Sequence, residues 1–416
     1  MGRRAFILLG ALGSGALGFF ACNTYDSSLL EPAPGGAVES RNGIGWWSKE
    51  DSRGCFSAGV PSLADRPGPQ DAKDVGPVIM AIESMKVGSL NDQGALDPNA
   101  WKDLGFDLDG VCTASDTCES VDPPPSCQVG GSALPRDGKY CRDNTFGRLE
   151  YAAALIPELT TKYGLSDDRF NCALCVGHYN FLIRVTGYNG EPNDDRVRID
   201  FYPSPGLEKP LPWDCSKPDW RTHPCFTPDM PWTVEEGATA DGRPGPELGD
   251  GKMFDDAAYV RDGYIVARLP EDTLFWFPGY KALVVAYPLR LQNAVVTGRI
   301  ARGADGIWRI GDGMIGGRTL GDDVVKGFRL MGFCDTNDPQ NYDLMTTFVR
   351  SNLDVLADGR SDSNVPCNAM SVGIGYTAVQ ARAGKLERVE PLVECKLHAS
   401  DGDAGADAQP KDAGVD

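Results

Sequence analysis

The chain has 416 residues, 41% of them hydrophobic and 24% charged, with a formal net charge of −19 at pH 7. The hydrophobic fraction is sufficient for a core and excludes wholesale disorder, while the length suits one large β domain or two ordinary ones. The acidic balance argues against nucleic acid as a partner, because a phosphate backbone requires a basic face. Three histidines leave little room for a His-rich metal centre.

The first 22 residues predict export from the cytoplasm. Met1–Arg4 is basic, Ala5–Phe20 is an uncharged apolar stretch, and Ala21 and Cys22 follow it. A small residue directly before a cysteine at the end of such a stretch resembles the lipobox of bacterial lipoproteins, with Phe19 in place of the usual leucine. The resemblance implies cleavage before Cys22 and attachment of lipid, including palmitate, to that cysteine. It also implies an anchor in the cell envelope, on the periplasmic or surface face of the outer membrane.

Other interpretations of this segment stay open. An ordinary cleaved signal or a single membrane anchor has a similar pattern, although 16 apolar residues are few for a spanning helix. Arg3–Leu8 resembles the twin-arginine export motif, and that route would carry the chain across the membrane already folded. The alternative is that the two arginines only supply the charge that any signal needs.

The cysteine count supports an oxidising compartment. Apart from Cys22 the chain has twelve cysteines, an even number that six disulfides would use. Spacing does not reveal the connectivity, but Cys215 and Cys225 bracket a short loop and are the expected local pair. The disulfide candidates are Cys55, Cys112, Cys118, Cys127, Cys141, Cys172, Cys175, Cys215, Cys225, Cys334, Cys367 and Cys395.

Composition divides the chain into four parts. Residues 1–21 are the expected signal peptide, and residues 22–43 form a Ser-, Pro- and Gly-rich tether that starts at the lipidated cysteine. Residues 44–398 are expected to form a single β-rich globular domain. Residues 399–416 are acidic and of low complexity, so they are expected to be disordered.

The central part is predicted to be mainly β. Nine Asp-Gly dipeptides occur, most of them between apolar runs, where they favour tight hairpin turns. Alternation of apolar and polar residues gives a strand one wet face, which favours antiparallel sheets over a parallel α/β core. We therefore expect an antiparallel, jelly-roll-like β-sandwich with helical, disulfide-bonded insertions. The expected strands are Val78–Val87, Phe181–Thr186, Val197–Phe201, Tyr264–Leu269, Leu274–Phe277, Leu283–Leu291, Val295–Ile300 and Ile307–Ile310.

Helices are expected in four places. Asn144 caps the first helix, and Pro157 inside that helix predicts a kink. The second helix stops at Gly177, and the third follows Gly321. The expected ranges are Thr145–Lys162, Ser166–Val176, Asp322–Leu330 and Asn341–Leu356.

Asp107 and Asp109 are the first candidates for carboxylate chemistry. The stretch Phe106–Val111 resembles the nucleophile motif of haloacid-dehalogenase-type phosphatases, in which the first Asp attacks phosphorus, the second handles the proton and both flank magnesium. Gly321–Asp323 imitates the later acidic metal motif of that family. The context departs from the family, because no buried parallel strand precedes Asp107 and no β/α alternation carries the sheet. The phosphatase interpretation is therefore disfavoured.

Calcium binding is a second interpretation of the same residues. Asp107 and Asp109, with a backbone carbonyl and Asp116, offer the oxygen ligands that Ca²⁺ prefers. The EF-hand spacing is absent, because Val111 stands at the fifth loop position and Cys118 at the twelfth. The alternative is an acidic turn whose carboxylates cap backbone amides.

Two further motifs resemble cofactor sites without the context that such sites need. Gly311–Gly316 matches the dinucleotide fingerprint, but no strand–helix unit surrounds it, so a hairpin or a strand-to-helix corner is expected. Cys172 and Cys175 form a CxxC pair with His178 nearby. A redox pair needs a preceding strand and zinc needs further ligands, so each cysteine is expected to pair elsewhere.

Tryptophans in Pro-rich stretches are the remaining candidates. Trp46, Trp47, Trp213, Trp220 and Trp232 lie in such stretches. Loop tryptophans can stack on sugar rings or anchor a protein partner. More often they seal the ends of a sandwich, and packing is the favoured interpretation. The serine-hydrolase elbow, the P-loop and the paired-His zinc-protease motif are absent from the sequence.

The whole chain resembles the large Cys-rich lipoproteins that bacteria place on their envelope. The favoured hypothesis is a non-catalytic binding or structural module that contacts a glycan, a cation or an envelope protein. The alternative is an extracytoplasmic hydrolase that acts on a polymer through Asp107 and Asp109. Geometry separates the two: carboxyl groups that face each other across a cleft favour the enzyme, and carboxyl groups turned into the backbone of their own loop favour the structural role.

Overall fold

The computed structural model describes residues 44–50, 55–70, 73–113, 125–130, 136–163, 166–245, 247–277 and 288–395. The expected lipidation site Cys22, the tether and the acidic tail lie outside these ranges. Asp116, Cys118 and residues 283–287 of an expected strand lie outside them as well. The described part of the chain is mainly β, as the alternating apolar pattern predicted.

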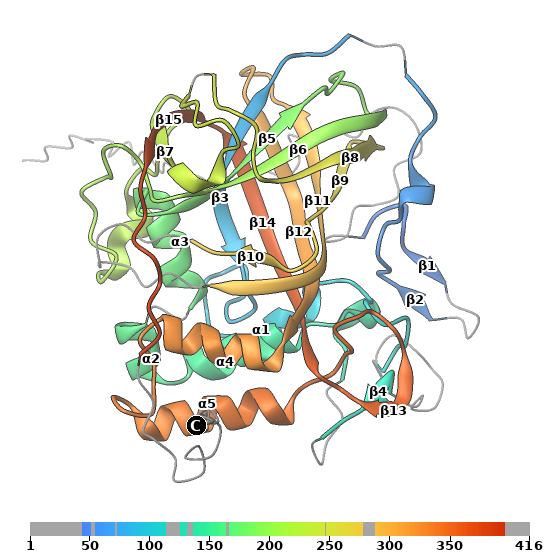
Figure 1. Ribbon diagram of the computed structural model, residues 1–416, viewed down its shortest axis with the longest axis vertical. Helices are drawn as coiled ribbons and strands as arrows, with labels where there is room; N and C mark the ends of the chain where they lie inside the picture. The colour runs from blue at the N-terminus through green and yellow to red at the C-terminus, as the bar shows by residue number, and fades with distance from the viewer. Residues whose placement is uncertain are drawn as a thin grey trace, which may run out of the picture.

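One sheet closes on itself to form a barrel (Figure 1). Eight of the described strands follow one another around the sheet in chain order, each antiparallel to the next, and the last pairs with the first. A ninth strand, β10 (Thr273–Phe275), pairs with the start of β11 beside β9. The barrel strands are β3 (Val78–Lys86), β5 (Asn180–Thr186), β6 (Asp194–Ser204), β8 (Met253–Arg261), β9 (Tyr264–Arg268), β11 (Leu289–Arg302), β12 (Trp308–Leu320) and β14 (Ala369–Gln380).

The expected β-sandwich is not what forms. Period-2 alternation reports only that each strand has two different faces, and this is equally true of a sandwich and of a barrel. The two folds differ in whether the last strand returns to the first, which depends on the pairing of β14 with β3 nearly 300 residues apart in the chain. No local pattern encodes that pairing.

The barrel interior is filled by side chains. Along β5, Phe181 and Ile183 join the largest core cluster inside the barrel, whereas Leu182 belongs to a separate cluster on the outer wall. On β9, Ile265 points inward and Val266 outward in the same way. A barrel of eight strands is just wide enough for its inward side chains to fill it.

Two coverings bury parts of the outer wall. The short strands β7 (Pro231–Glu235) and β15 (Arg382–Glu387) pair with each other, and Trp232 packs with Leu182. The N-terminal segment places Trp47 against residues of β8, β9, β11 and β12. The other short strand pairs are β1 (Lys49–Glu50) with β2 (Phe56–Ser57), and β4 (Cys127–Gln128) with β13 (Asp362–Pro366).

Helices cover one end of the barrel, where α1, α4 and α5 lie below the strands, while α3 lies at the side (Figure 1). Asn144 caps α1 by accepting a hydrogen bond from the Gly147 amide, and Gly177 ends α3 with a left-handed φ of 77°, as expected. The described helices are α1 (Thr145–Ala154), α2 (Pro157–Lys162), α3 (Asp167–Val176), α4 (Gly321–Leu330) and α5 (Pro339–Ser351). Short 3-10 helices occur at Leu63–Asp65, Ala100–Asp103, Lys139–Cys141, Pro218–Thr222 and Glu236–Ala238.

Two helix predictions were wrong in extent. The segment expected as one kinked helix breaks into two, because Pro157 has no amide hydrogen to continue α1 and instead becomes the first residue of α2. The helix expected to reach Leu356 ends at Ser351. The residues that follow run alongside β14 instead, where Val355 bridges Ala369.

The disulfides confirm the structural interpretation of the CxxC pair but not the expected local pair. Cys172 and Cys175 lie on one face of α3 and bond to Cys215 and Cys225 respectively, so the predicted bond between those two loop cysteines is wrong. Cys55 is also disulfide-bonded. The other pairs described are Cys112–Cys141, Cys127–Cys367 and Cys334–Cys395.

Most of the described tryptophans serve packing. Trp46, Trp213 and Trp276 are half-buried, and Trp213 stacks on His223 with ring centroids 4.2 Å apart. The buried tryptophans, each 8% exposed or less, are Trp47, Trp101, Trp220, Trp232 and Trp308.

The predicted Asp-Gly hairpin turn is confirmed between β8 and β9, whereas the pair Asp312-Gly313 lies inside β12. Asp262 and Gly263 join β8 to β9 with φ angles of 49° and 80°, as a tight hairpin requires. The prediction that Gly311–Gly316 forms a hairpin or a strand-to-helix corner was wrong, because this segment lies inside β12. A Cβ on Gly316 would lie 2.3 Å from the Phe106 ring, so this glycine clears space for a loop that crosses the outer wall.

Candidate metal centre

The loop that carries Asp107 and Asp109 is held on three sides. Phe106 accepts a backbone hydrogen bond from Asp143, and the Asp107 amide donates to Ala58. Just beyond the loop, Cys112 bonds to Cys141. These contacts bring Asp143, more than 30 residues further along the chain, beside the loop.

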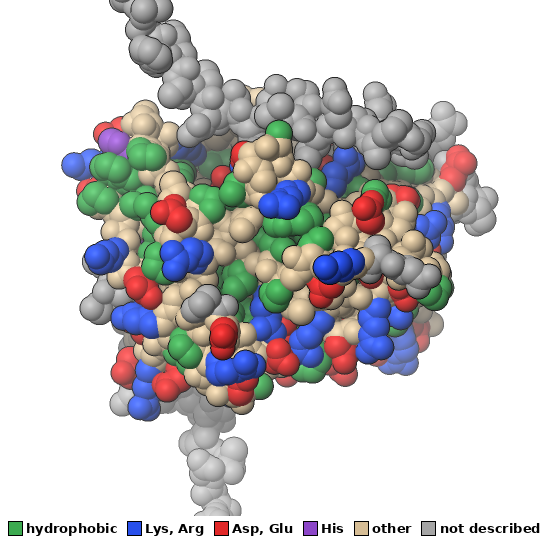
Figure 2. Space-filling view, turned by 90° about the horizontal axis from the view of Figure 1, so that it is seen from above, with side chains coloured by type: hydrophobic (Ala, Val, Ile, Leu, Met, Phe, Trp, Pro, Cys, Tyr) green, Lys and Arg blue, Asp and Glu red, His purple; other side chains and the backbone are tan. Residues whose placement is uncertain are grey.

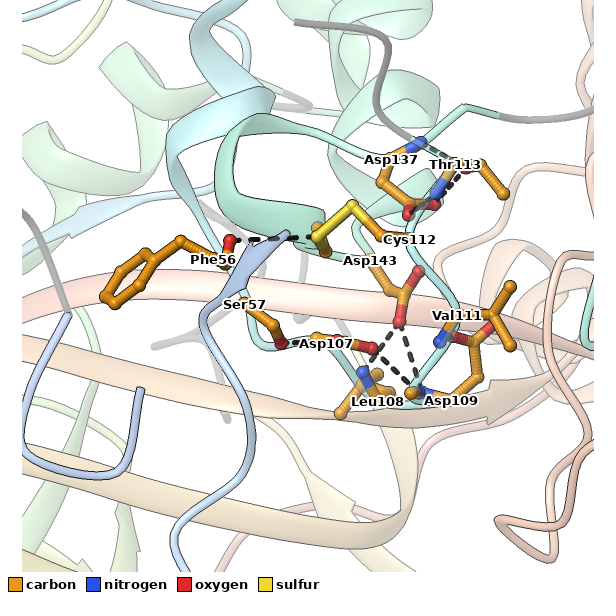
Figure 3. The surroundings of a disulfide bond; sticks show 12 residues. Phe56, Ser57, Asp107, Leu108, Asp109, Val111, Cys112, Thr113, Asp137 and Asp143 are labelled. Carbon is orange, nitrogen blue, oxygen red and sulfur yellow. Dashed lines mark hydrogen bonds between the residues drawn. A yellow bond between two sulfur atoms is a disulfide. The ribbon is translucent and has the colours of Figure 1, made fainter. Parts of the chain in front are cut away.

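Three carboxylates converge there, as Figure 3 shows. Asp107, Asp109 and Asp143 each place a carboxylate oxygen within 4.8 Å of the others, and the first and last are buried. Asp143 Oδ2 accepts from the Leu108 amide at 2.6 Å. Such a set of hard oxygen donors is what a divalent cation needs.

The carboxylates of Asp107 and Asp109 are turned into their own loop. Asp107 Oδ1 accepts from the Gly110 amide at 2.7 Å, while its other oxygen accepts from the Ser57 hydroxyl. Asp109 Oδ1 accepts from the Val111 amide at 2.8 Å. This is the arrangement expected of a structural role, since opposed acid and base groups of a hydrolase would face each other across a cleft.

Negative charge is concentrated around the three carboxylates. Burial is the main cause of the raised pKa of Asp143, and four neighbouring carboxylates raise it further. Those neighbours are Asp109, Asp137, Asp107 and Asp354. Burial also raises the pKa of Asp109, although the Ser126 hydroxyl and the Val111 amide nearby lower it.

Arg318 is the nearby cationic group on the barrel. It is 6% exposed and donates from Nη2 to the Leu108 carbonyl at 2.5 Å. Burial lowers the pKa of Arg318, while Asp143, Asp109 and Asp354 raise it. Among the described residues, the guanidinium groups of Arg318 and, near Asp354, Arg148 do not balance five carboxylates, so the centre as a whole favours a further cation or bound protons.

Ser126 supplies an independent sign of a ligand. Its side chain is buried to 4% exposure and lies beside Asp109, where its hydroxyl lowers the pKa of that carboxyl. Yet in the part of the chain that the structure describes, Ser126 Oγ has no partner at good hydrogen-bonding geometry. A buried hydroxyl is rarely left without a hydrogen bond, and a metal ion bound between the Ser126 hydroxyl and the nearby carboxylate oxygens would satisfy it.

The sequence predicted Asp107 and Asp109 but missed Asp143 and Ser126. Asp143 lies two residues after Cys141 and directly before the helix cap Asn144, a context that does not distinguish it from a structural residue. Only the pairing of Cys112 with Cys141 would have placed it near the loop. Asp116, the other expected ligand, lies outside the described residues.

The remaining motif residues do not join this centre. Cys172 and Cys175 are in disulfides, so they hold no metal. Asp322 and Asp323 start α4, and the described three-carboxylate group contains neither. The phosphatase-like motif therefore lacks its second half.

Comparison with protein-family models, with curated proteins and with solved structures gave no match. Among the described residues, we find no helix with the length and apolar character needed to cross a bilayer. On the face seen from the top of Figure 1, Lys and Arg side chains lie among Asp and Glu side chains (Figure 2). That face therefore offers no purely basic surface for a phosphate backbone.

Proposed function

We propose that this protein is a lipid-anchored, non-catalytic binding or structural module of the bacterial cell envelope, with loops organised by a calcium ion at Asp107, Asp109 and Asp143. The observation that carries the proposal is the convergence of these carboxylates in a buried region of excess negative charge. A divalent cation there would replace costly repulsion with coordination.

Calcium fits this donor set better than magnesium or zinc. All the candidate ligands are oxygens, whereas zinc sites in proteins are built mainly from cysteine and histidine. Magnesium keeps most of its water and demands a near-ideal octahedron, whereas calcium accepts several protein oxygens in irregular geometry. The region around Asp143 is enclosed, which favours ligands from the protein over a shell of water.

The envelope location rests on two features of the chain. The segment that ends at Cys22 has the form of a lipoprotein signal, and the cysteines in the described ranges are in disulfides rather than free thiols. Disulfides persist in oxidising compartments outside the cytoplasm. A glycan or an envelope protein is the partner class that suits this location, and the acidic chain argues against nucleic acid.

Calcium titration tests the centre. We expect the metal-free mature chain to bind one Ca²⁺ and to unfold at a higher temperature with calcium than with chelator. Asp143→Asn removes a ligand charge with little change in shape and should abolish both effects. The matched control is Asp322→Asn on the exposed start of α4, which should behave like the wild type. Equal unfolding temperatures in calcium and chelator would rule the centre out.

Fractionation tests the anchor separately. The full-length precursor expressed in a bacterial host should yield a membrane-bound product whose N-terminal peptide carries acyl groups on Cys22. Cys22→Ser should release the protein from the membrane or leave the precursor unprocessed. An unmodified N-terminal peptide in the wild type would refute the lipoprotein assignment and leave the calcium proposal intact.

A further inference from the structure

A second site lies on the outer wall of the barrel, where a cavity of about 230 Å³ opens between the strands and the loop that follows β3. We call it the wall groove. Leu104 and Met314, both 6% exposed or less, contribute to its apolar lining. Four carboxylates also line it, those of Asp92, Asp97, Asp103 and Asp312.

Irregularities of the sheet converge on this groove. The register of β12 with β14 shifts between Ile310 and Gly313, and that of β14 with β3 shifts at Thr377. The pairing of β11 with β12 shifts at the same level, between Thr297 and Arg299. Bulges redirect side chains and are common beside functional sites. Three shifts at one level make the wall groove a built feature of the barrel.

Asp312 is the residue that the β12 bulge presents. Its φ of 49° lies in the left-handed region, which Asp and Asn adopt more readily than most residues. Its carboxylate is 35% exposed, and Arg299 Nε lies 4.0 Å from it, beyond hydrogen-bonding distance. The bulge therefore directs to the groove a carboxylate that has a long ion pair with Arg299 but no hydrogen bond to it.

The four carboxylates of the groove differ in their partners. Asp92 accepts from Lys86 Nζ at 2.5 Å, and both oxygens of Asp103 accept from Lys139 Nζ at 2.8 Å. Asp97 uses Oδ1 to cap the Asn99 amide at 2.8 Å. Two of the four thus already hold ammonium groups of the protein itself. Among the described residues, Asp97 has no ion pair and Asp312 has only the 4.0 Å pair with Arg299.

We propose that the wall groove binds a primary ammonium group, from a free alkylamine or a lysine side chain, between Asp97 and Asp312. The apolar lining at Leu104 and Met314 accommodates the short alkyl segment that carries the charge. The volume of the wall groove is below the range of about 300–1,000 Å³ that is typical of pockets for drug-sized ligands, so the groove suits one small amine or one side chain.

This inference gives the proposed binding module a ligand class, but it does not depend on the calcium centre. None of the residues that line the groove belongs to the three-carboxylate group at Asp107, Asp109 and Asp143. Measurements at saturating calcium keep that centre constant and prevent the groove result from reporting on it. A failure of one proposal is therefore distinguishable from a failure of the other.

Calorimetric titration of the mature chain with 1,5-diaminopentane tests the proposal, with 1,5-pentanediol as a neutral probe of the same length. We expect the diamine to bind once per chain and the diol not to bind. Asp312→Asn keeps a residue that tolerates the positive φ and should weaken diamine binding about tenfold or more, since a charge-assisted hydrogen bond is lost. The matched control is Asp262→Asn, which makes the same change of charge at the same φ of 49° in the β8–β9 turn and should leave affinity unchanged.

A blocked Gly-Lys-Gly peptide, titrated in the same way, separates the two sources of the ammonium group. Tighter binding of the peptide than of the diamine assigns the groove to a protein partner, and the reverse order assigns it to a free amine. The proposal is overturned if neither probe binds, if the diol binds as well as the diamine, or if Asp312→Asn and Asp262→Asn have the same effect.

Discussion

Glu150 is a buried acid whose replacement should stabilise the protein in a pH-dependent way. It lies on α1 with 1% of its surface exposed, and its Oε2 has no hydrogen-bond partner among the residues that the structure describes. It borders a cavity of about 20 Å³ otherwise lined by apolar side chains, among them Met85, Phe146 and Phe275. Such a cavity has room for one water but offers it a single polar group, too few to hold it in place. The ionised form of Glu150 is therefore poorly solvated.

Burial raises the pKa of Glu150 from 4.5 to about 8, and the nearby Asp167 contributes to the rise. Above pH 4.5 the unfolded chain has released this proton, whereas the folded chain keeps it until about pH 8. The folded state thus binds more protons in this window, so its stability falls as pH rises. Each unit of pKa difference corresponds to 1.36 kcal/mol, so the loss across the window is about 5 kcal/mol.

Glu150→Gln removes the titration and nearly preserves the shape. Its free energy of unfolding, measured by urea denaturation with disulfides intact and calcium fixed, should be close to that of the wild type at pH 4.5. The variant should become progressively more stable than the wild type toward pH 8, by up to about 5 kcal/mol. Using the difference between two proteins cancels the other titrating groups.

The control is Glu158→Gln on α2, which makes the same change at an exposed position and should give no comparable pH-dependent difference. The reasoning fails if the difference between wild type and Glu150→Gln is constant from pH 4.5 to pH 8. A constant difference would mean that Glu150 is ionised in both states or that solvent reaches it.

Three further predictions concern stability. Gly105→Ala should lower the free energy of unfolding by about 2 kcal/mol or more and weaken calcium binding. The reason is that φ is 103° at this position and the new Cβ would lie 2.6 Å from the Asp143 carbonyl oxygen. Thermal unfolding and calcium titration check the two effects. Asp200→Ala should cost about 3–5 kcal/mol in urea denaturation, because this fully buried carboxylate pairs with two arginines. Replacing Cys175 and Cys225 by serine should cost about 3 kcal/mol, because the Cys172–Cys215 bond remains and already closes most of the 50-residue loop.

Local features of the fold could be predicted because local chemistry determines them. Asn144 and Ser166 cap helices by side-chain hydrogen bonds to the amide three residues on, and Gly177 adopts a left-handed φ that other residues resist. Strands such as Val78–Lys86 were found because inward and outward residues alternate. Each of these signals lies within a few residues of the feature it predicts.

Closure of the barrel and the disulfide pattern could not be predicted, since both depend on distant segments. The Cys215–Cys225 bond was expected because these two cysteines are close in sequence. In the structure they bond instead to Cys172 and Cys175, which lie one turn apart on α3. The Gly311–Gly316 motif was misjudged for a similar reason. Its glycines are explained by what crosses the strand, Phe106 over Gly316 and Tyr376 beside Gly313.

The candidate metal centre was half predictable. Asp107 and Asp109 stand out because two acidic residues flank one position in an Asp-Gly turn, a common source of oxygen ligands. Asp143 is brought to them by a backbone bridge to Phe106 and by the Cys112–Cys141 bond. Tertiary structure alone turned an acidic turn into a three-carboxylate group.

Because side chains fill the barrel interior, it has no room for a ligand. Large residues such as Phe181, Phe201 and Trp308 belong to the barrel core, so contact with a ligand has to come from the outer wall and its loops. The loop that walls the groove at Leu104 continues directly into the Asp107 turn, and between the two sites the Gly105 amide donates to Met314 Sδ at 3.1 Å. An ion that fixes the Asp107 turn would therefore also fix one wall of the groove. This is the use that a binding module has for a buried cation, whereas a hydrolase would need the same carboxylates exposed to substrate.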